Sequence, residues 1–203
     1  MKNFRLKDKY RFGFPKKRGL YDPQFEKDSC GVGLVANIKG TPSREIMDDA
    51  FHVNSQMDHR GGCGFEENTG DGAGILMALP DSFFRAEAKK IEISLPEIGQ
   101  YAVGNVFLPT DQSEREFCIK ETESIIKEEN QICLGWREVP VDPEGANVGP
   151  ASRSAQPYIK QLFVRCLDGI SKDEFDRKLY LIRKRISNLI RNSEELKEAK
   201  LFY

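Results

Sequence analysis

The sequence of 203 residues carries 31 lysines and arginines against 32 aspartates and glutamates, a formal net charge of −1. This balance argues against a dedicated nucleic-acid binder, which would show a basic excess, and no apolar run approaches the roughly 18 residues of a transmembrane helix. The five cysteines are an odd number without a CxxC pair. They indicate a reducing, cytoplasmic compartment, and favour neither a disulfide framework nor a structural metal site.

The charge is unevenly distributed along the chain. Nine basic and four acidic side chains give residues 1–29 a net charge of +5, so the remaining 174 residues carry −6. This leader has no continuous apolar stretch, so it is not a secretory signal, and with Ser29 as its one serine it does not resemble a transit peptide. Residues 1–29 are either a solvated basic arm or a segment whose function depends on Cys30, the residue that follows it.

The first elements predicted after the leader are a strand, a helix and a second strand. Residues 31–38 are apolar and β-branched, which is typical of a buried strand. Thr41, followed by proline, resembles an N-cap and predicts a helix over residues 42–59. A glycine-dense loop over residues 60–74 leads to a second apolar strand over residues 73–79.

The rest of the chain predicts three strands and two helices. Each helix is expected to begin at a capping box, in which a serine and a glutamate three residues later bond to each other's backbone. The apolar stripe of the last helix covers barely two heptads, which favours packing into a core over a coiled coil. The strands are expected near residues 99–109, 132–141 and 159–167, a loop over 142–157, and the capping boxes at Ser113 with Glu116 and at Ser171 with Glu174.

Cys30 lies between small residues at the start of the first predicted strand. An ordinary cysteine in this position is a buried structural thiol. If the leader is removed between Ser29 and Cys30, however, the thiol and a free α-amino group lie on one residue. An α-amino group with a pKa of about 7.7–8.0 can accept a proton at neutral pH. The pair then forms a minimal nucleophile and base, as in N-terminal nucleophile enzymes.

Several sequence blocks resemble the glutamate synthase large-subunit family. Residues 20–40 resemble its start, and residues 59–75, His-Arg-Gly-Gly-Cys-Gly-Phe-Glu-Glu-Asn-Thr-Gly-Asp-Gly-Ala-Gly-Ile, resemble its next block. His-Arg-Gly is shared by many class II glutamine amidotransferases, whereas Asn-Thr-Gly-Asp-Gly-Ala-Gly is more particular to glutamate synthase. Matching motifs continue in order at residues 101–109, 134–142 and 157–163.

The resemblance implies an α+β fold, the four-layer αββα sandwich of N-terminal-nucleophile hydrolases, incomplete in this chain. Residues 1–29 would be a propeptide, and residues 30–203 the N-terminal portion of a class II glutamine amidotransferase domain. Cys30 would attack the side-chain amide of L-glutamine, giving a γ-glutamyl thioester and the ammonia that the family uses to make glutamate from 2-oxoglutarate. Arg60 matches the arginine beside the catalytic cysteine, where its charge would favour the thiolate. A helix-terminal cation that binds carbonyl groups is an equal alternative for Arg60.

The same resemblance implies that several residues of the glutaminase site lie outside these 203 residues. The family's oxyanion donors, an Asn-Gly pair, and its side-chain clamps for glutamine come later in the domain, and these 203 residues contain no Asn-Gly dipeptide. Since losing one oxyanion donor alone can cost ~10²–10³ in rate, the chain by itself is expected to be inactive. Residues 200–203 turn apolar, which suggests truncation.

The expected partners are L-glutamine, the remainder of the large subunit, and a small subunit or ferredoxin. FMN and an iron–sulfur cluster are implied for the full-length parent, and no cofactor motif is found in this chain. A second hypothesis is a non-catalytic binding or assembly module that retains part of the amidotransferase sandwich.

Overall fold

The computed structural model consists of two units, of which unit 1 comprises Met1–Phe65 with Gly70–Ile75 and unit 2 comprises Glu66–Thr69 with Leu76–Tyr203. The structure describes residues 17–20, 31–57, 66, 70, 72–194, 196, 197 and 199. None of the helices in these ranges combines the length and apolar character that a membrane crossing requires.

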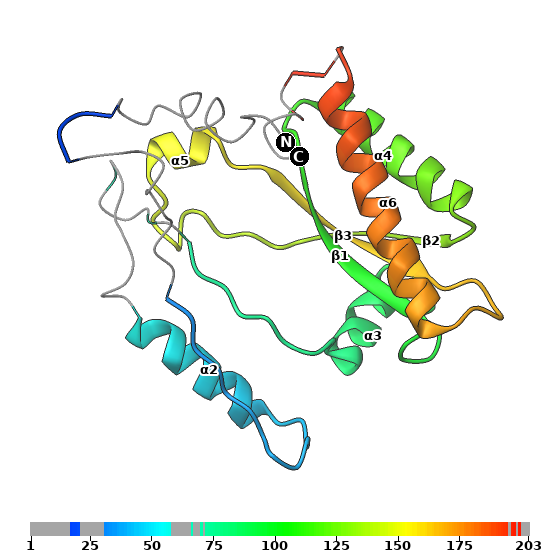
Figure 1. The fold of residues 1–203 in the computed structure, drawn as a ribbon, viewed down its shortest axis with the longest axis horizontal. Coiled ribbons are helices and arrows are strands. Elements are labelled where there is room, and N and C mark those ends of the chain that lie inside the picture. Colours follow the sequence, from blue (N-terminus) through cyan, green and yellow to red (C-terminus); the bar gives the residue numbers. More distant parts are fainter. Residues whose placement is uncertain are drawn as a thin grey trace. The chain divides into compact units, whose positions relative to one another are not determined.

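Unit 1 contains the helix α2(Arg44–Gln56), along which the segment that follows residue 30 runs (Figure 1). The helix confirms the prediction for residues 42–59, but its N-cap is Ser43 and not Thr41. The Ser43 hydroxyl accepts a hydrogen bond from the Ile46 backbone N–H at 3.3 Å, and so satisfies one of the unpaired donors of the first turn. Pro42 therefore precedes the cap.

The strands predicted over residues 31–38 and 73–79 are not found. Neither segment joins another described segment in a β-ladder, although each has the apolar composition of a buried strand. Their side chains are correspondingly exposed: Val32 is 89% exposed, Leu34 90% and Leu76 102%. A strand exists only where a neighbour accepts and donates its backbone hydrogen bonds, and the described residues provide no such neighbour for either segment.

Unit 2 is built on a three-stranded antiparallel sheet with the strand order β1-β3-β2. Tyr101 is opposite Arg165, and Leu108 is opposite Tyr158, so β3 lies at the centre of the sheet. All three strands confirm sequence predictions, with ends that differ from the predicted ones by at most three residues. They are β1(Tyr101–Leu108), β2(Ile132–Glu138) and β3(Tyr158–Arg165).

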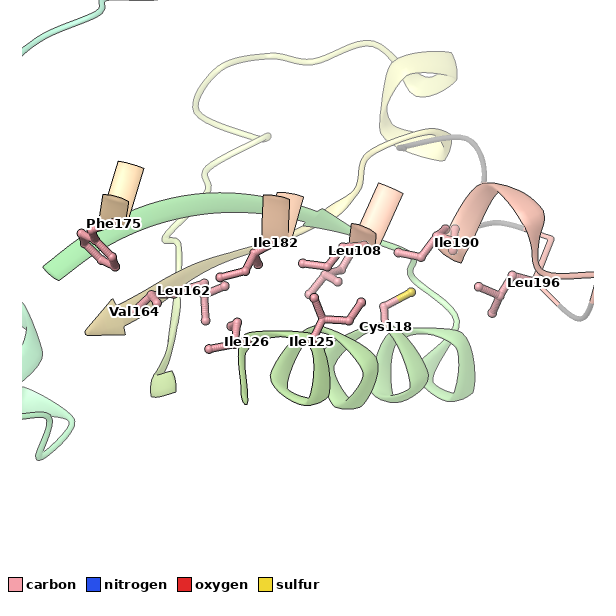
Figure 2. Packing of buried hydrophobic residues seen from close by; sticks show 12 residues of the cluster. Leu108, Cys118, Ile125, Ile126, Leu162, Val164, Phe175, Ile182, Ile190 and Leu196 are labelled. Carbon is pink, nitrogen blue, oxygen red and sulfur yellow. The ribbon is translucent and has the colours of Figure 1, made fainter. Parts of the chain in front are cut away.

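Two helices, α4(Gln112–Glu128) and α6(Lys172–Asn192), cover one face of this sheet and form the larger core with it (Figures 1 and 2). Alternate residues of β1 and β3 face these helices, as the two-residue period of a strand requires, whereas in β2 a register shift between Cys133 and Gly135 places Cys133 and Trp136 on this face. The stripe of α6 packs into this core, as predicted from its length. The buried members include Leu108, Cys118, Ile125, Ile126, Leu162, Val164, Phe175, Ile182, Ile186 and Ile190.

The capping predictions for these helices have different outcomes. Ser171 is the N-cap of α6, and its hydroxyl accepts from the Glu174 N–H at 3.2 Å, as expected. For α4 the prediction of Ser113 was wrong, because Asp111 is the N-cap. One Asp111 oxygen accepts from the Glu114 N–H at 2.9 Å and from the Ser113 hydroxyl at 2.6 Å. The carboxylate thus takes the place that the sequence assigned to the serine.

The helix α3(Asp81–Lys90), which the sequence did not predict, packs against the opposite face of the sheet. Phe84 of α3 meets Phe163 of β3 edge to face, with ring centroids 5.8 Å apart. The N-cap position of α3 is Pro80, so the helix start lacks the capping side chain by which α4 and α6 begin. Unit 2 is therefore a mixed α/β layer structure, and a second sheet is not seen among the described residues.

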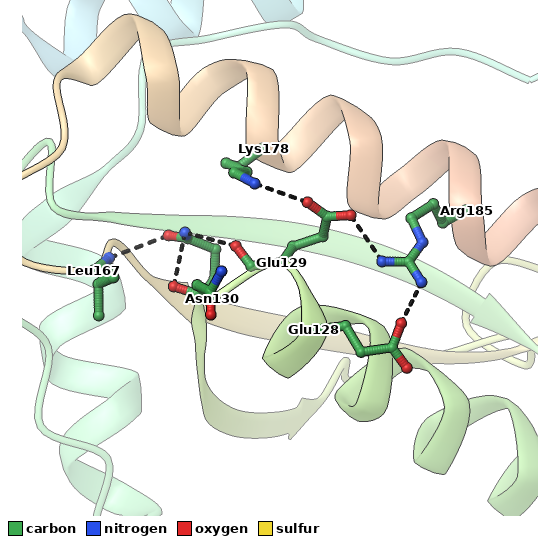
Figure 3. Close-up of polar contacts among 7 residues, drawn as sticks. Glu128, Glu129, Asn130, Leu167, Lys178 and Arg185 are labelled. Carbon is green, nitrogen blue, oxygen red and sulfur yellow. Dashed lines mark hydrogen bonds and ion pairs between the residues drawn. The ribbon is translucent and has the colours of Figure 1, made fainter.

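Ion pairs join α4 to α6 on the surface of the larger core (Figure 3). Glu129, which ends α4, accepts from Lys178 at 2.9 Å and from Arg185 at 2.7 Å, and Arg185 also binds Glu128. These bonds, first that to Lys178 and then that to Arg185, hold the pKa of Glu129 below its ordinary value. The two helices are thus fastened by a charge network as well as by apolar packing.

Candidate active site

Cys30 and Arg60, the two residues predicted to act in catalysis, lie outside the described residues, as does Cys63. The structure does describe the segments next to them in the chain. Residues 31–57 begin directly after Cys30, and Glu66 lies six residues after Arg60.

In unit 1, the segment after Cys30 packs closely on the C-terminal part of α2. A Cβ atom added at Gly33 would collide with Val53 and lie 2.7 Å from Cε of Met57, so a larger residue there would have to push Val53 aside. Gly33 is three residues after Cys30, and Met57 is three residues before Arg60. One close contact therefore joins the sequence neighbourhoods of the two predicted site residues.

In unit 2, Glu66 binds the short helix α5(Pro150–Ser154). Its two carboxylate oxygens accept from the backbone N–H groups of Ala151, at 2.7 Å, and Ser152, at 3.2 Å. The N-cap of α5 is Gly149, which has no side chain to supply this cap. Glu66 thus caps a helix that lies 85 residues away in the sequence.

The loop over residues 142–157, which contains α5, is held together by its own hydrogen bonds. The Arg153 guanidinium donates to the carbonyl of Val148 at 3.0 Å and to that of Pro143 at 3.1 Å. An Asp142 carboxylate oxygen accepts from the Gly145 N–H at 2.8 Å. Glu66 therefore binds a braced segment of backbone.

The described cysteines are unsuited to nucleophilic chemistry. Burial raises the pKa of the Cys118 and Cys133 thiols to about 11 each, and it also raises that of Cys166. Thiols with such pKa values are protonated at neutral pH, and the protonated thiol is a poor nucleophile. Cys118 lies wholly within the larger core, where it packs as a small apolar side chain. Within the described ranges, no cluster of three or more His, Cys, Asp and Glu side chains is suited to holding a metal ion.

Sequence reasoning had not singled out Glu66. Its signal is indirect: a helix that begins Gly-Pro lacks a capping side chain of its own, and a carboxylate from elsewhere in the chain can supply the missing acceptor. Nothing in the sequence links these two features across 85 residues.

Comparison with known proteins identifies the family. Residues 30–203 match the glutamine amidotransferases of class II. The chain is 42% identical over 175 residues to the glutamate synthase [NADPH] large chain of Bacillus subtilis (strain 168), covering 86% of this chain and 11% of the relative. It is 41% identical over 183 residues to the glutamate synthase [NADH] of Saccharomyces cerevisiae, covering 85% of this chain and 8% of the relative.

A third relative is the ferredoxin-dependent glutamate synthase 2 of Synechocystis sp., 37% identical over 158 residues, with 78% of this chain and 10% of the relative covered. The chain thus spans about a tenth of the length of the curated relatives it matches. With a family match over residues 30–203 and identities of 37–42% to these glutamate synthases, the chain belongs to the class II glutamine amidotransferases.

Proposed function

We propose that residues 30–203 are part of a glutaminase domain, which hydrolyses L-glutamine and supplies ammonia to a glutamate synthase. The observation that carries this proposal is that the family match begins at Cys30. This is the residue at which removal of residues 1–29 would create an N-terminal cysteine. We therefore propose that the boundary between a propeptide and the amidotransferase domain lies between Ser29 and Cys30.

In the proposed reaction, the α-amino group of the processed Cys30 takes the thiol proton, directly or through a water molecule. The sulfur attacks the side-chain amide carbon of glutamine, the C–N bond breaks, and the nitrogen leaves as ammonia after receiving that proton. Water then attacks the γ-glutamyl thioester, releasing glutamate and restoring the thiol. The overall change is glutamine and water to glutamate and ammonia.

Arg60 is proposed to support this nucleophile with its positive charge, which favours the thiolate. The contact between Gly33 and Met57 supports the assignment. Cys30 and Arg60 are each three residues from that contact, a distance of at most about 11 Å of extended chain. The alternative, in which Arg60 binds carbonyl groups at the end of α2, requires no effect on the pKa of Cys30.

We further propose that segments 31–38 and 73–79 are strands of a second sheet in the complete αββα sandwich. The exposed apolar side chains of Val32, Leu34 and Leu76 support this proposal, because a buried strand needs a partner on each side and a cover on each face. The resemblance assigns the family's oxyanion donors and glutamine clamps to residues that have no counterpart among residues 30–203, so we propose that residues 30–203 alone lack glutaminase activity.

The proposal for the whole protein is glutamate formation from 2-oxoglutarate in the cytoplasm, with FMN and an iron–sulfur cluster held outside this chain. Electrons would reach these cofactors through a small subunit or from ferredoxin. The names of the relatives include NADPH, NADH and ferredoxin-dependent forms, and one from Arabidopsis thaliana is named chloroplastic/mitochondrial.

The test is a glutaminase assay on the intact protein and two cysteine variants. Cys30→Ala is expected to abolish ammonia release, whereas Cys63→Ala, in the same predicted neighbourhood, is expected to retain it. An intact protein that binds its partners but releases no ammonia from glutamine would support the alternative, a binding or assembly module without catalysis. Full activity of Cys30→Ala would refute the assignment of the nucleophile.

A further inference from the structure

We infer that the outer edge of β1 and the groove beside it hold one further strand, which the segment following Ala199 supplies and which runs antiparallel to β1. The inference rests on the proposal that residues 30–203 are part of a large subunit, and it does not depend on glutaminase chemistry. The edge, the groove and the end of α6 all belong to unit 2.

Alternate backbone groups of β1 have no partner among the described residues. The Cys166 N–H donates to the Gln100 carbonyl at 2.8 Å, which makes residues 100 and 166 a hydrogen-bonded pair. Because such pairs alternate along an antiparallel ladder, the N–H and C=O groups of residues 102, 104, 106 and 108 point towards β3. The groups of Val103, Asn105 and Phe107 point away from β3, to a side where the described part of the chain places no strand.

The two edges of the sheet differ in their protection against further pairing. At the β2 edge, the register shifts between Cys133 and Gly135, and the strand carries Arg137 and Glu138. Bulges and charged side chains of this kind discourage the addition of another strand. β1 pairs regularly over its 8 residues and contains neither a charged residue nor a proline. The β1 edge is therefore the one that is suited to accept a strand.

A groove of about 540 Å³ lies between the β1 edge and α6. Gly104 lines it, and a Cβ atom there would meet nothing within 4 Å. Since Gly104 lies in a regular strand, neither its surroundings nor its backbone conformation requires glycine, and a glycine inside a strand is typical of a site where another backbone approaches closely. The apolar residues that line the groove are suited to the alternate apolar side chains of a strand. They include Ala102, Val106, Leu179, Ile182 and Ile186.

The connection through α6 directs the next strand to the β1 edge and not to the β2 edge. β1 and β3 run in opposite directions, and the helices that follow them, α4 and α6, cover the same face of the sheet (Figure 1). Helical connections between parallel strands are right-handed in about 98% of cases. Two such connections on one face therefore cross the sheet in opposite directions when their first strands are antiparallel. The connection through α4 passes from β1 across β3 to β2, so the connection through α6 passes from β3 across β1 to the free edge.

The residues after α6 are held at the end of β1 where such a strand begins. The backbone N–H groups of Lys197 and Ala199 donate to the two carboxylate oxygens of Glu114, at 2.9 Å and 2.8 Å. Glu114 lies in the first turn of α4, six residues after Leu108, the last residue of β1. A strand antiparallel to β1 starts at this end. In the sequence, residues 201–203, which lie outside the described residues, are leucine, phenylalanine and tyrosine, and the two aromatic residue types are enriched in strands.

The experiment measures amide hydrogen exchange along β1 in the intact protein. With a strand on the edge, the N–H groups of Val103, Asn105 and Phe107 should exchange as slowly as those of their neighbours in β1, on the order of 100-fold or more below the rate of an unbonded amide. Asn105→Pro removes one outward donor and leaves the bonds to β3 in place, so the other two amides should lose this protection. Glu138→Pro removes an outward donor from the β2 edge and should leave exchange along β1 unchanged.

A photocrosslinking amino acid identifies the strand that occupies the groove. p-Benzoylphenylalanine in place of Arg183, which is exposed and lines the groove, should react with the segment that follows Ala199. A mixture of isotope-labelled and unlabelled protein should show that the crosslink forms within one chain. The control position is Tyr180, which is also on α6 and is 55% exposed but does not line the groove. A crosslinker there should not react with that segment.

Fast exchange confined to Val103, Asn105 and Phe107 in the wild type would show an open edge and overturn the inference. So would a crosslink from position 183 to a second copy of the chain, to a separate subunit, or to the segments 31–38 and 73–79. If Asn105→Pro does not fold, Gly104→Leu, whose side chain would fill the groove, carries the same comparison against Gly104→Ala. A protein with a protected β1 edge that releases no ammonia from glutamine would contradict the proposed function and support this inference, so the two failures are distinguishable.

Discussion

Replacing Phe163 with alanine is expected to remove much of the stability of unit 2. Phe163 lies in the central strand, is fully buried, and meets Phe84 edge to face at a centroid distance of 5.8 Å. Truncation of a buried phenylalanine to alanine costs about 3–5 kcal/mol, of which the aromatic pair accounts for about 0.5–1.5 kcal/mol. For a urea m-value of about 2 kcal/mol/M, a loss of about 4 kcal/mol lowers the unfolding midpoint by about 2 M.

The assay is urea unfolding followed by the fluorescence of Trp136, the protein's single tryptophan. Trp136 packs against the core on the other face of the sheet, so its signal reports whether both faces unfold together. Phe107→Ala is the matched control, since Phe107 shares the sheet face of Phe163 but is 46% exposed, and it should cost less than about 1 kcal/mol. Equal losses in the two variants, or a loss below about 1 kcal/mol for Phe163→Ala, would refute this account of the core.

Three further predictions concern other contacts. Glu129→Gln should lower the free energy of unfolding at neutral pH by about 1 kcal/mol. Because the pKa of Glu129 is depressed in the folded state, the wild type should lose this advantage over the variant as the pH falls through that pKa. A difference between the urea midpoints of wild type and variant that stays constant down to about pH 3 would contradict this prediction. Burial and the bond to Asp81 raise the pKa of Tyr101 to about 12, above its unfolded value of about 10. Stability should therefore fall between about pH 10 and about pH 12 in the wild type and less so in Tyr101→Phe, whereas identical alkaline unfolding curves would count against a buried neutral phenol. Gly33→Ala should force Val53 aside and cost about 1–3 kcal/mol, seen as faster amide hydrogen exchange along α2; unchanged exchange would show that the close contact is absent.

The sequence predicted elements whose signals are local and failed where the deciding partner is distant. Ser171 was predicted correctly as a cap because the serine and its donor are three residues apart. Ser113 was not, because the Asp111 carboxylate two residues earlier accepts from the first turn in its place. The segment 31–38 has the composition of a strand, but composition does not supply a neighbouring strand.

The candidate site divides in the same way. Cys30 and Arg60 were named from motifs that are contiguous in the sequence, and their roles stay predictions. Glu66 was not named, because its partners at the start of α5 are 85 residues away and are backbone groups, which have no residue type for a pattern to detect. The need for glycine at position 149 follows only from the structure, in which a Cβ atom there would collide with the Glu66 carboxylate.

The central claim is that Cys30 is the N-terminal nucleophile of a glutaminase, and mass spectrometry of the intact protein tests it most directly. After incubation with a glutamine-mimicking electrophile, we expect a chain that begins at Cys30, lacks residues 1–29, and carries one adduct on that cysteine. Cys30→Ala should retain the leader and carry no adduct. A fully active wild-type protein that keeps residues 1–29, or that carries its adduct on another cysteine, would contradict the account.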